Sequence, residues 1–405
     1  MKNIIDNKEN LKKLIKLFND NGYEIYLVGG VVRDTLLGRD VNDIDFTTSA
    51  SPSEMIEMLG KLYKLNLNGL KHGTVGVITG GAMYEITTFR TEAGYLDNRH
   101  PDYVKFVRNI YEDLARRDFT INALAVSPNN FDEIIDYFNG LKDLENRIIR
   151  TVLKSKKRFK EDALRILRGL RFASSLGFKI ERKTKKAIFK YYKHLASISK
   201  ERIRDELKGM VCGENYYEVF KEYKKVFDFL FETRFNKDAL AIIKEKITLL
   251  DNSLERITLI FNFVKDPLKV TKDLRFSNIE TSNIINGLSI INVDINSNKD
   301  MRLLLNKYHP NEVYNGIRVK GALEGDSNKY ISQFIDNKDK PNRIKDLDIN
   351  GNDLIKLDIY KRNIGFVLKE IMNSVISEEV DNNKEDLIKK ALEIKEKLIY
   401  KRGKI

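Results

Sequence analysis

Residues 23–48 read YEIYLVGGVVRDTLLGRDVNDIDFTT, and this stretch decides the fold of the first part of the chain. The apolar run Ile25–Val28 predicts a buried strand, and Val31–Leu37 predicts a short helix. Gly29 and Gly30 form the turn between them. A glycine turn that leads into a helix presents free backbone N–H groups, which suit a phosphate. The stretch therefore predicts a strand–turn–helix unit that holds a phosphate group.

Two aspartates follow this unit, Asp43 and Asp45, at the predicted strand Ile44–Thr47. Residues i and i+2 of a strand point to the same face, so the two carboxylates are expected side by side. Two close carboxylates keep both charges only when a cation lies between them. Mg²⁺ takes a few carboxylate oxygens and binds substrate phosphates at its other positions. We expect Arg33 and this metal pair to hold one triphosphate from two sides.

The composition indicates a soluble protein of the cytoplasm. The chain has 405 residues, 42% of them hydrophobic, and one cysteine, which excludes an internal disulfide. The polar, amphipathic N-terminal segment lacks the apolar run of a signal peptide, and no stretch approaches the length of a membrane span. We therefore expect no membrane association.

The character of the sequence changes near Arg150. Before it, short alternating or apolar runs predict the strands Tyr26–Val28, Ile44–Thr47, Thr74–Ile78, Tyr84–Arg90 and Val104–Val107. Beyond it, glycine and proline are sparse and apolar residues recur at helical spacing. We expect an α+β head over residues 1–150, with a small mixed sheet and helices. An all-helical neck (151–213), body (214–338) and tail (339–405) should follow.

The net charge of +13 is concentrated in the neck. Residues 150–208 hold 20 Lys and Arg against 6 Asp and Glu, a local charge of +14. Clustered positive charge on helices is typical of a contact with a nucleic-acid backbone. The alternative is an ordinary solvated helix face.

Three further motifs carry residue types suited to nucleotide chemistry. In YEITTFR (84–90), Glu85 is either a third carboxylate for the metal or an exposed strand residue. In EDLARRDFTINALAV (112–126), helical spacing puts Asp118 and Asn122 one turn apart on a single face, next to Arg117. An arginine suits a phosphate oxygen, and Asp and Asn suit ribose hydroxyls. The alternative is a helix start at which Asp118 caps and Asn122 is buried.

The last motif is RFKEDALRILRGLRFASSLGF (158–178). Its apolar residues form a helical core stripe, and Asp162 and Arg165, at i and i+3, are expected on the exposed side. Arg168 and Arg171 continue along the helix. A carboxylate accepts from an exocyclic amine and a guanidinium donates to a ring nitrogen, so such a pair accepts cytosine and adenine and rejects uracil and guanine. A surface salt bridge is the alternative.

These motifs resemble those of class II tRNA nucleotidyltransferases (CCA-adding enzymes) and bacterial poly(A) polymerases, within the superfamily typified by DNA polymerase β. The resemblance is strong over residues 22–178 and weaker over about 340–395. It implies a polymerase-β-like head in which Asp43 and Asp45 are the catalytic metal ligands. It also implies nucleotide contacts at Gly30, Arg33, Arg117, Asp118, Asn122, Asp162, Arg165, Arg168 and Arg171, with Asp162 and Arg165 reading the base.

The segment RTEAGYLDNRHPDYVKFV (90–107) predicts a loop that returns into a strand. It is similar to the flexible loop that the family needs for adding the terminal A. The matching residues are Arg90, Thr91, Glu92, Tyr95, Asp97, Arg99 and Pro101.

From the resemblance we expect template-independent addition of CCA to tRNA 3′ ends from CTP and ATP, with Mg²⁺ as cofactor and tRNA as partner. No protein partner can be inferred. The rivals are a poly(A) polymerase, an enzyme that adds only the final A, and a non-catalytic RNA-binding protein that has kept the fold.

Overall fold

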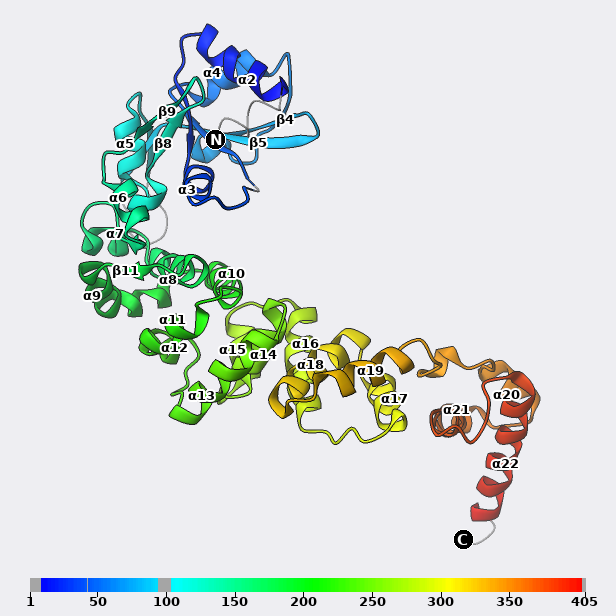
Figure 1. Ribbon diagram of the computed structural model, residues 1–405. Helices are drawn as coiled ribbons and strands as arrows, with labels where there is room; N and C mark the ends of the chain where they lie inside the picture. The colour runs from blue at the N-terminus through cyan, green and yellow to red at the C-terminus, as the bar shows by residue number, and fades with distance from the viewer. Residues whose placement is uncertain (1–8, 42, 94–102, 403–405) are drawn as a thin grey trace. The chain divides into compact units, whose positions relative to one another are not determined.

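The computed structural model describes residues 9–41, 43–93 and 103–402. The chain forms two compact units, Met1–Leu230 and Phe231–Ile405 (Figure 1). The first unit carries the strands and the helices that follow them, and the second is helical. No helix among the described residues is long and apolar enough to cross a membrane.

The first unit is built on a mixed seven-stranded sheet. Its strand order is β3 (Lys64–Asn66), β4 (Thr74–Thr79), β5 (Ala82–Thr88), β2 (Asp45–Thr48), β1 (Ile25–Val28), β8 (Ala125–Ser127) and β9 (Asn130–Ile135). Strands β2 and β5 run parallel and the other neighbours are antiparallel. The expected small mixed sheet is confirmed, while β3, β8 and β9 were not predicted.

Five helices accompany the sheet: α2 (Glu9–Asp20), α3 (Gly30–Leu36), α4 (Pro52–Leu59), α5 (Ile110–Ala115) and α6 (Gly140–Glu145). Helix α4 starts where its sequence dictates, since Ser51 and Glu54 form a capping box and Pro52 occupies the first turn. Helix α2 buries one apolar stripe that includes Leu11, Leu14 and Phe18.

A hairpin follows the sheet strand β5. Strand β6 (Arg90–Ala93) pairs antiparallel with β7 (Tyr103–Phe106). Arg90, Thr91 and Glu92 therefore belong to a strand rather than a loop. Tyr95, Asp97, Arg99 and Pro101 lie outside the described residues, so the loop itself stays a prediction.

Six helices complete the first unit: α7 (Ser155–Glu161), α8 (Leu164–Leu176), α9 (Arg182–Tyr191), α10 (Lys200–Val211), α11 (Tyr216–Glu222) and α12 (Lys224–Leu230). The last two lie beyond the expected end of the neck at residue 213. Helix α8 packs against both α10 and α11 and is buried along most of its length. The expectation of a purely helical neck is wrong in one detail. Gly177 ends α8 in the left-handed conformation, and the chain then extends as β11 (Lys179–Ile180) beside β10 (Ile148–Ile149).

The described part of the second unit holds helices and no strand, as expected. Its α-helices are α13 (Lys237–Lys246), α14 (Ser253–Phe261), α15 (Pro267–Asp273), α16 (Asn278–Ile291), α17 (Asn298–Lys307), α18 (Pro310–Glu324), α19 (Ser327–Asn337), α20 (Gly351–Lys356), α21 (Lys361–Ile376) and α22 (Lys384–Arg402).

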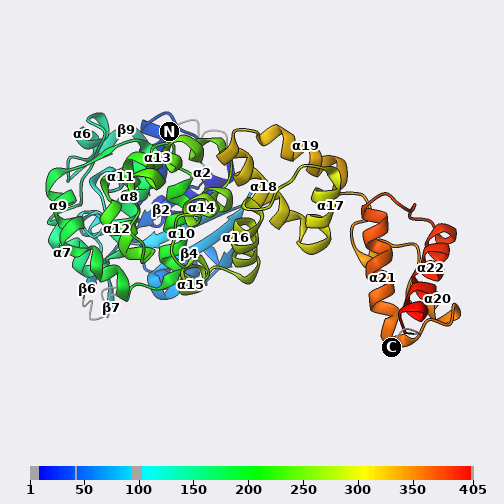
Figure 2. The same ribbon diagram turned by 90° about the horizontal axis from the view of Figure 1, so that it is seen from below.

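Two apolar cores lie within this second unit. One joins the helices from α16 to α19, and the other joins α20, α21 and α22, which pack together (Figure 2). The buried guanidinium of Arg302 links the two groups of helices. It donates to the Pro341 carbonyl at 2.8 Å and to the Val375 carbonyl at 2.8 Å.

Candidate active site

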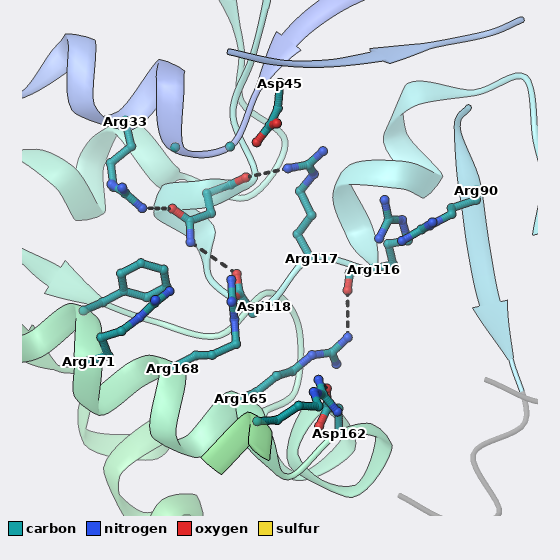
Figure 3. A pocket seen from close by; sticks show the side chains of 15 residues that line it. Arg33, Asp45, Arg90, Arg116, Arg117, Asp118, Asp162, Arg165, Arg168 and Arg171 are labelled. Atoms are coloured by element: carbon teal, nitrogen blue, oxygen red, sulfur yellow. Dashed lines mark hydrogen bonds and ion pairs between the residues drawn. The ribbon is translucent and has the colours of Figure 1, made fainter. Parts of the chain in front are cut away.

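One cavity in the first unit, of about 550 Å³, is lined by residues from each of the predicted motifs (Figure 3). Eight arginines and three aspartates line it, so its wall carries an excess of positive charge. The lining residues are Gly29, Gly30, Arg33, Asp45, Arg90, Arg116, Arg117, Asp118, Asn122, Asp162, Arg165, Arg168, Arg171, Phe172 and Arg202. An arginine-rich cavity of this size suits a polyanion such as a nucleoside triphosphate.

The glycine turn before α3 brings backbone against the cavity wall. Gly29 has φ 76° and ψ −129°, a backbone conformation that residues with a Cβ atom rarely adopt. A Cβ at this position would also lie 3.1 Å from Nη1 of Arg117. Only glycine therefore lets the backbone and the Arg117 guanidinium share this part of the wall.

Arg33 extends from α3 into the cavity and is itself buried. Its Nη1 donates to Oδ1 of Asn122 at 2.7 Å, and its Nη2 forms an ion pair with Asp34 at 2.7 Å (Figure 3). The side chain that we expected at a phosphate is thus held in place by two polar partners.

Asp45 is the first residue of β2 and points its carboxylate into the cavity (Figure 3). Glu85 lies directly across from it on the parallel strand β5. Partial burial raises the pKa of Asp45, and the negative charges of Glu85 and Asp43 raise it further, while Arg117 opposes them. The site thus holds more negative charge around Asp45 than its own arginine balances.

Asp43 does not share the strand with Asp45, contrary to the expectation of two strand neighbours. Strand β2 begins at Asp45, and Asp43 precedes it as an exposed residue that is not among the described lining residues. Among the residues that the structure describes, no three His, Cys, Asp or Glu side chains are grouped as a metal site. A magnesium ion needs only one or two protein carboxylates when substrate phosphates supply other ligands, and the excess negative charge around Asp45 fits such an ion.

The expectation that Asp118 and Asn122 share a helix face is wrong, although the two residues do meet. Helix α5 ends at Ala115, Phe119 is extended, and a single 3-10 turn covers Thr120–Asn122. Every residue from Asp118 to Val126 is buried, so this segment has no exposed face of the kind that a surface helix shows.

Both polar side chains of this segment are buried in the cavity wall. Nδ2 of Asn122 donates to Oδ1 of Asp118 at 3.3 Å, and Oδ2 of Asp118 accepts from Nε of Arg168 at 2.7 Å. Burial alone would raise the pKa of Asp118, but the Arg168 guanidinium outweighs it and lowers the pKa to about 2. The carboxylate of Asp118 is therefore charged throughout the physiological range.

Arg168 and Arg171 lie on α8 and share the carboxylate of Glu206, from α10. The Glu206 oxygens lie 3.7 Å from Nη1 of Arg168 and 2.9 Å from Nε of Arg171. Burial lowers the pKa of Arg171, and Glu206 partly compensates. The two arginines keep their charge at a wall that excludes much of the solvent.

We had expected Asp162 and Arg165 on the exposed side of one helix, and the structure places neither of them there. Asp162 occupies the break between α7 and α8, where its Oδ1 accepts from the Leu164 N–H at 2.9 Å. Its Oδ2 accepts from Nη2 of Arg202 at 2.8 Å. Because the first turn of α8 faces the cavity, both predicted base-reading residues line it.

The Arg165 guanidinium has other partners. It is buried, donates to Glu161 at 2.8 Å and to the carbonyl of Arg116 at 3.1 Å (Figure 3). The side chains of Asp162 and Arg165 thus contact different neighbours. Each is held by its own partners and not by an ion pair between the two.

The sequence interpretation missed three lining residues: Arg116, Phe172 and Arg202. Arg116 and Arg117 both pair with the fully buried Asp113, at 2.9 and 3.2 Å, and their i+3 and i+4 spacing from it could have revealed this. Arg202 reaches Asp162 from α10, 40 residues along the chain, and no local pattern marks it.

Comparison with known protein families covers most of the chain. Residues 25–150 match a family described as "Poly A polymerase head domain", and residues 177–231 match "Probable RNA and SrmB- binding site of polymerase A". Residues 246–391 match a family described as tRNA nucleotidyltransferase domain 2.

Individual relatives match over nearly the whole length. A CCA-adding enzyme of Staphylococcus haemolyticus is 37% identical over 391 residues, which is 93% of this chain and 96% of the relative. One from Ligilactobacillus salivarius is 35% identical and covers 98% of this chain and 100% of the relative. The crystal structure of the Bacillus stearothermophilus CCA-adding enzyme in complex with CTP superposes with a TM-score of 0.81 at 29% identity, over 96% of this chain and 98% of that one.

Proposed function

Because the chain belongs to the family of CCA-adding enzymes, we propose that its arginine-lined cavity is where nucleotides are added to the 3′ end of tRNA. The protein is a template-independent nucleotidyltransferase that adds C, C and A from CTP and ATP. In each step the 3′-hydroxyl oxygen of the tRNA bonds to the α-phosphorus of the incoming nucleotide. The bond from that phosphorus to the bridging oxygen breaks, pyrophosphate leaves, and the hydroxyl proton is released.

One observation carries the assignment of the site. A single cavity brings together side chains from four motifs that extend from Gly30 to Arg171. Polar and charged residues that are far apart in the sequence but line one cavity are typical of a ligand-binding site.

Enzymes of this family generally use divalent metal ions, and we assign the ion to Mg²⁺ held by Asp43 and Asp45, with Glu85 in support. What favours this is the placement of Glu85 opposite Asp45 and the unbalanced negative charge there. When bound, the ion supplies positive charge for the attacking and leaving oxygens. The carboxylates of the chain would hold the ion, and Arg117, whose charge acts on Asp45, would compete with it for that carboxylate.

The triphosphate is bound by the glycine turn and by arginines in this proposal. The backbone at Gly30 approaches it closely, and Arg33, Arg117, Arg168 and Arg171 neutralise its charge. Asp118 and Asn122, which hydrogen-bond to each other, hold the ribose side of the nucleotide.

Asp162 and Arg165 select the base. A carboxylate oxygen accepts more than one hydrogen bond, so Asp162 can accept from the exocyclic amine of cytosine or adenine while it keeps Arg202. Uracil and guanine offer it a carbonyl oxygen, which it repels. Arg165, oriented by Glu161, donates to the neighbouring ring nitrogen.

The rivals make different products from the same tRNAs. Purified protein is incubated with tRNAs that end before C, after CC and after CCA, each with CTP alone, ATP alone or both. We expect two C residues from CTP on the first tRNA, one A from ATP on the second and no addition to the third.

An enzyme that adds only A leaves the first tRNA unextended with CTP, and a poly(A) polymerase extends all three with ATP. A protein that only binds RNA extends none. The cytoplasmic location expected from the composition stays a prediction.

A further inference from the structure

Phe172 is an aromatic residue in a wall that is otherwise charged and polar. It lies on α8, lines the cavity and is 7% exposed. Three guanidinium groups lie over its ring. The Cζ atoms of Arg33, Arg168 and Arg171 are 5.0, 5.5 and 5.3 Å from the ring centroid. Arg33 comes from α3 and the other two from α8, so the ring gathers cations from two separate elements.

Packing alone does not require an aromatic ring here. Phe119 contacts Phe172 edge-on, with centroids 5.8 Å apart and planes at 87°, and this contact accounts for one side of the ring. Three guanidiniums, which repel one another, also lie over the ring. The negative face of an aromatic ring attracts such cations, and an aliphatic side chain of similar volume does not.

Carboxylates counter part of the same repulsion. Arg33 pairs with Asp34, Arg168 with Asp118, and Arg171 with Glu206. Glu206 lies beside both Arg168 and Arg171, but none of these carboxylates pairs with all three arginines, whereas the ring contacts all three. The ring is therefore the common contact that sets their spacing.

From this geometry we infer that Phe172 is a positioning residue that holds Arg33, Arg168 and Arg171 at the spacing of a triphosphate, whichever base the nucleotide carries. The inference rests on the proposed function of the cavity. It adds a residue that contacts the arginines rather than the base, and it predicts equal effects on CTP and ATP.

Inorganic tripolyphosphate tests the inference without base, tRNA or turnover. Its binding to the full-length protein is measured by calorimetry for the wild type and for Phe172→Leu. We expect the dissociation constant to rise about tenfold in the variant, equivalent to about 1.4 kcal/mol. The KM values for CTP and ATP should rise by the same factor, with their ratio unchanged. Replacing Phe172 by phenylalanines with one, two and three ring fluorines, which weaken the negative face at nearly constant shape, should weaken binding step by step.

Phe178→Leu is the matched control. Phe178 is also buried and lies under one guanidinium, that of Arg147 at 5.6 Å, but it does not line the cavity. This variant should bind tripolyphosphate as the wild type does.

Three results overturn the inference: unchanged binding in Phe172→Leu, a fluorine series without a trend, or an equal loss in Phe178→Leu. Wild-type protein that adds nucleotides but does not bind tripolyphosphate overturns it as well. Protein that adds no nucleotide at all contradicts the proposed function instead, and the two failures are thereby separated.

Discussion

Replacing Asp162 by asparagine keeps the shape of the side chain and removes its charge. In the structure its Oδ1 accepts from the Leu164 N–H at the start of α8, and its Oδ2 faces the cavity beside Arg202. An asparagine can keep the first contact through its amide oxygen. Asp162→Ala loses both, so the pair of variants separates base reading from the start of the helix.

The magnitude follows from the contacts. A hydrogen bond to a charged group contributes about 1.5–3 kcal/mol and one between neutral groups about 0.5–1.5 kcal/mol. With its amide oxygen on the Leu164 N–H, the asparagine turns an NH2 group toward the cavity and cannot accept from the exocyclic amine, so Asp162→Asn should lower kcat/KM for CTP and ATP about tenfold to a hundredfold. Its amide can donate to the carbonyl of uracil or guanine, so the preference for CTP over UTP should fall by about a hundredfold in total. Asp162→Ala should lose tenfold to a hundredfold with CTP and ATP, and about 1 kcal/mol of folding stability with the lost contact to Leu164.

The assay is kcat/KM for CTP, ATP, UTP and GTP on one tRNA that ends before the first C, with thermal denaturation of each variant alongside. Asp136→Asn is the control, since Asp136 also accepts a backbone N–H, that of Gly140 at 2.8 Å, but lies outside the lining of the cavity. An equal loss for all four nucleotides in both Asp162 variants would refute base reading by this carboxylate and leave it a purely structural role.

Three further outcomes are expected. Asp45→Ala should abolish nucleotide addition in the presence of Mg²⁺ and leave tRNA affinity within about twofold, which a filter-binding assay measures; appreciable remaining activity would contradict the metal assignment. Charge reversal of the exposed neck lysines Lys183 and Lys186 should reduce the salt dependence of tRNA affinity, because phosphate contacts release counterions, and an unchanged slope would mean a solvated face. The lowered pKa of Asp118 stabilises the folded state by roughly 2 kcal/mol above its unfolded pKa of about 3.9, and this stabilisation is lost as the pH falls toward about 2. The difference in the free energy of unfolding between wild type and Asp118→Asn, measured in urea, should therefore shrink over that range. A constant difference would refute the Arg168 contact as its source.

Local sequence patterns predicted four of the seven strands of the head sheet, and the motifs together with the family resemblance pointed to most of the residues that line the cavity. The strand–turn–helix unit at Gly29 and the stripe of α8 depend on neighbours within one or two turns, and such features are visible in a short window. The segment from Asp118 to Asn122 was misjudged because Asp118 and Asn122 fit the helical spacing by chance, whereas the segment is buried throughout and forms only a 3-10 turn. The contact of Asp162 with Arg202 could not be predicted, because it depends on how α10 packs against α8.

Seven arginines of the cavity wall are paired with six carboxylates of the chain, since Arg116 and Arg117 share Asp113. Arg33, Arg116, Arg117, Arg165, Arg168, Arg171 and Arg202 each pair with an aspartate or glutamate of the chain. An incoming polyphosphate is thus exchanged against carboxylates that are already present, and it gains only the difference between the two kinds of ion pair. When pyrophosphate departs, the carboxylates form their ion pairs with the arginines again. In the proposed site the positive charge of the wall is thus partly paired before the nucleotide arrives, and we expect this to weaken the retention of pyrophosphate in an enzyme that must empty its site three times on one tRNA.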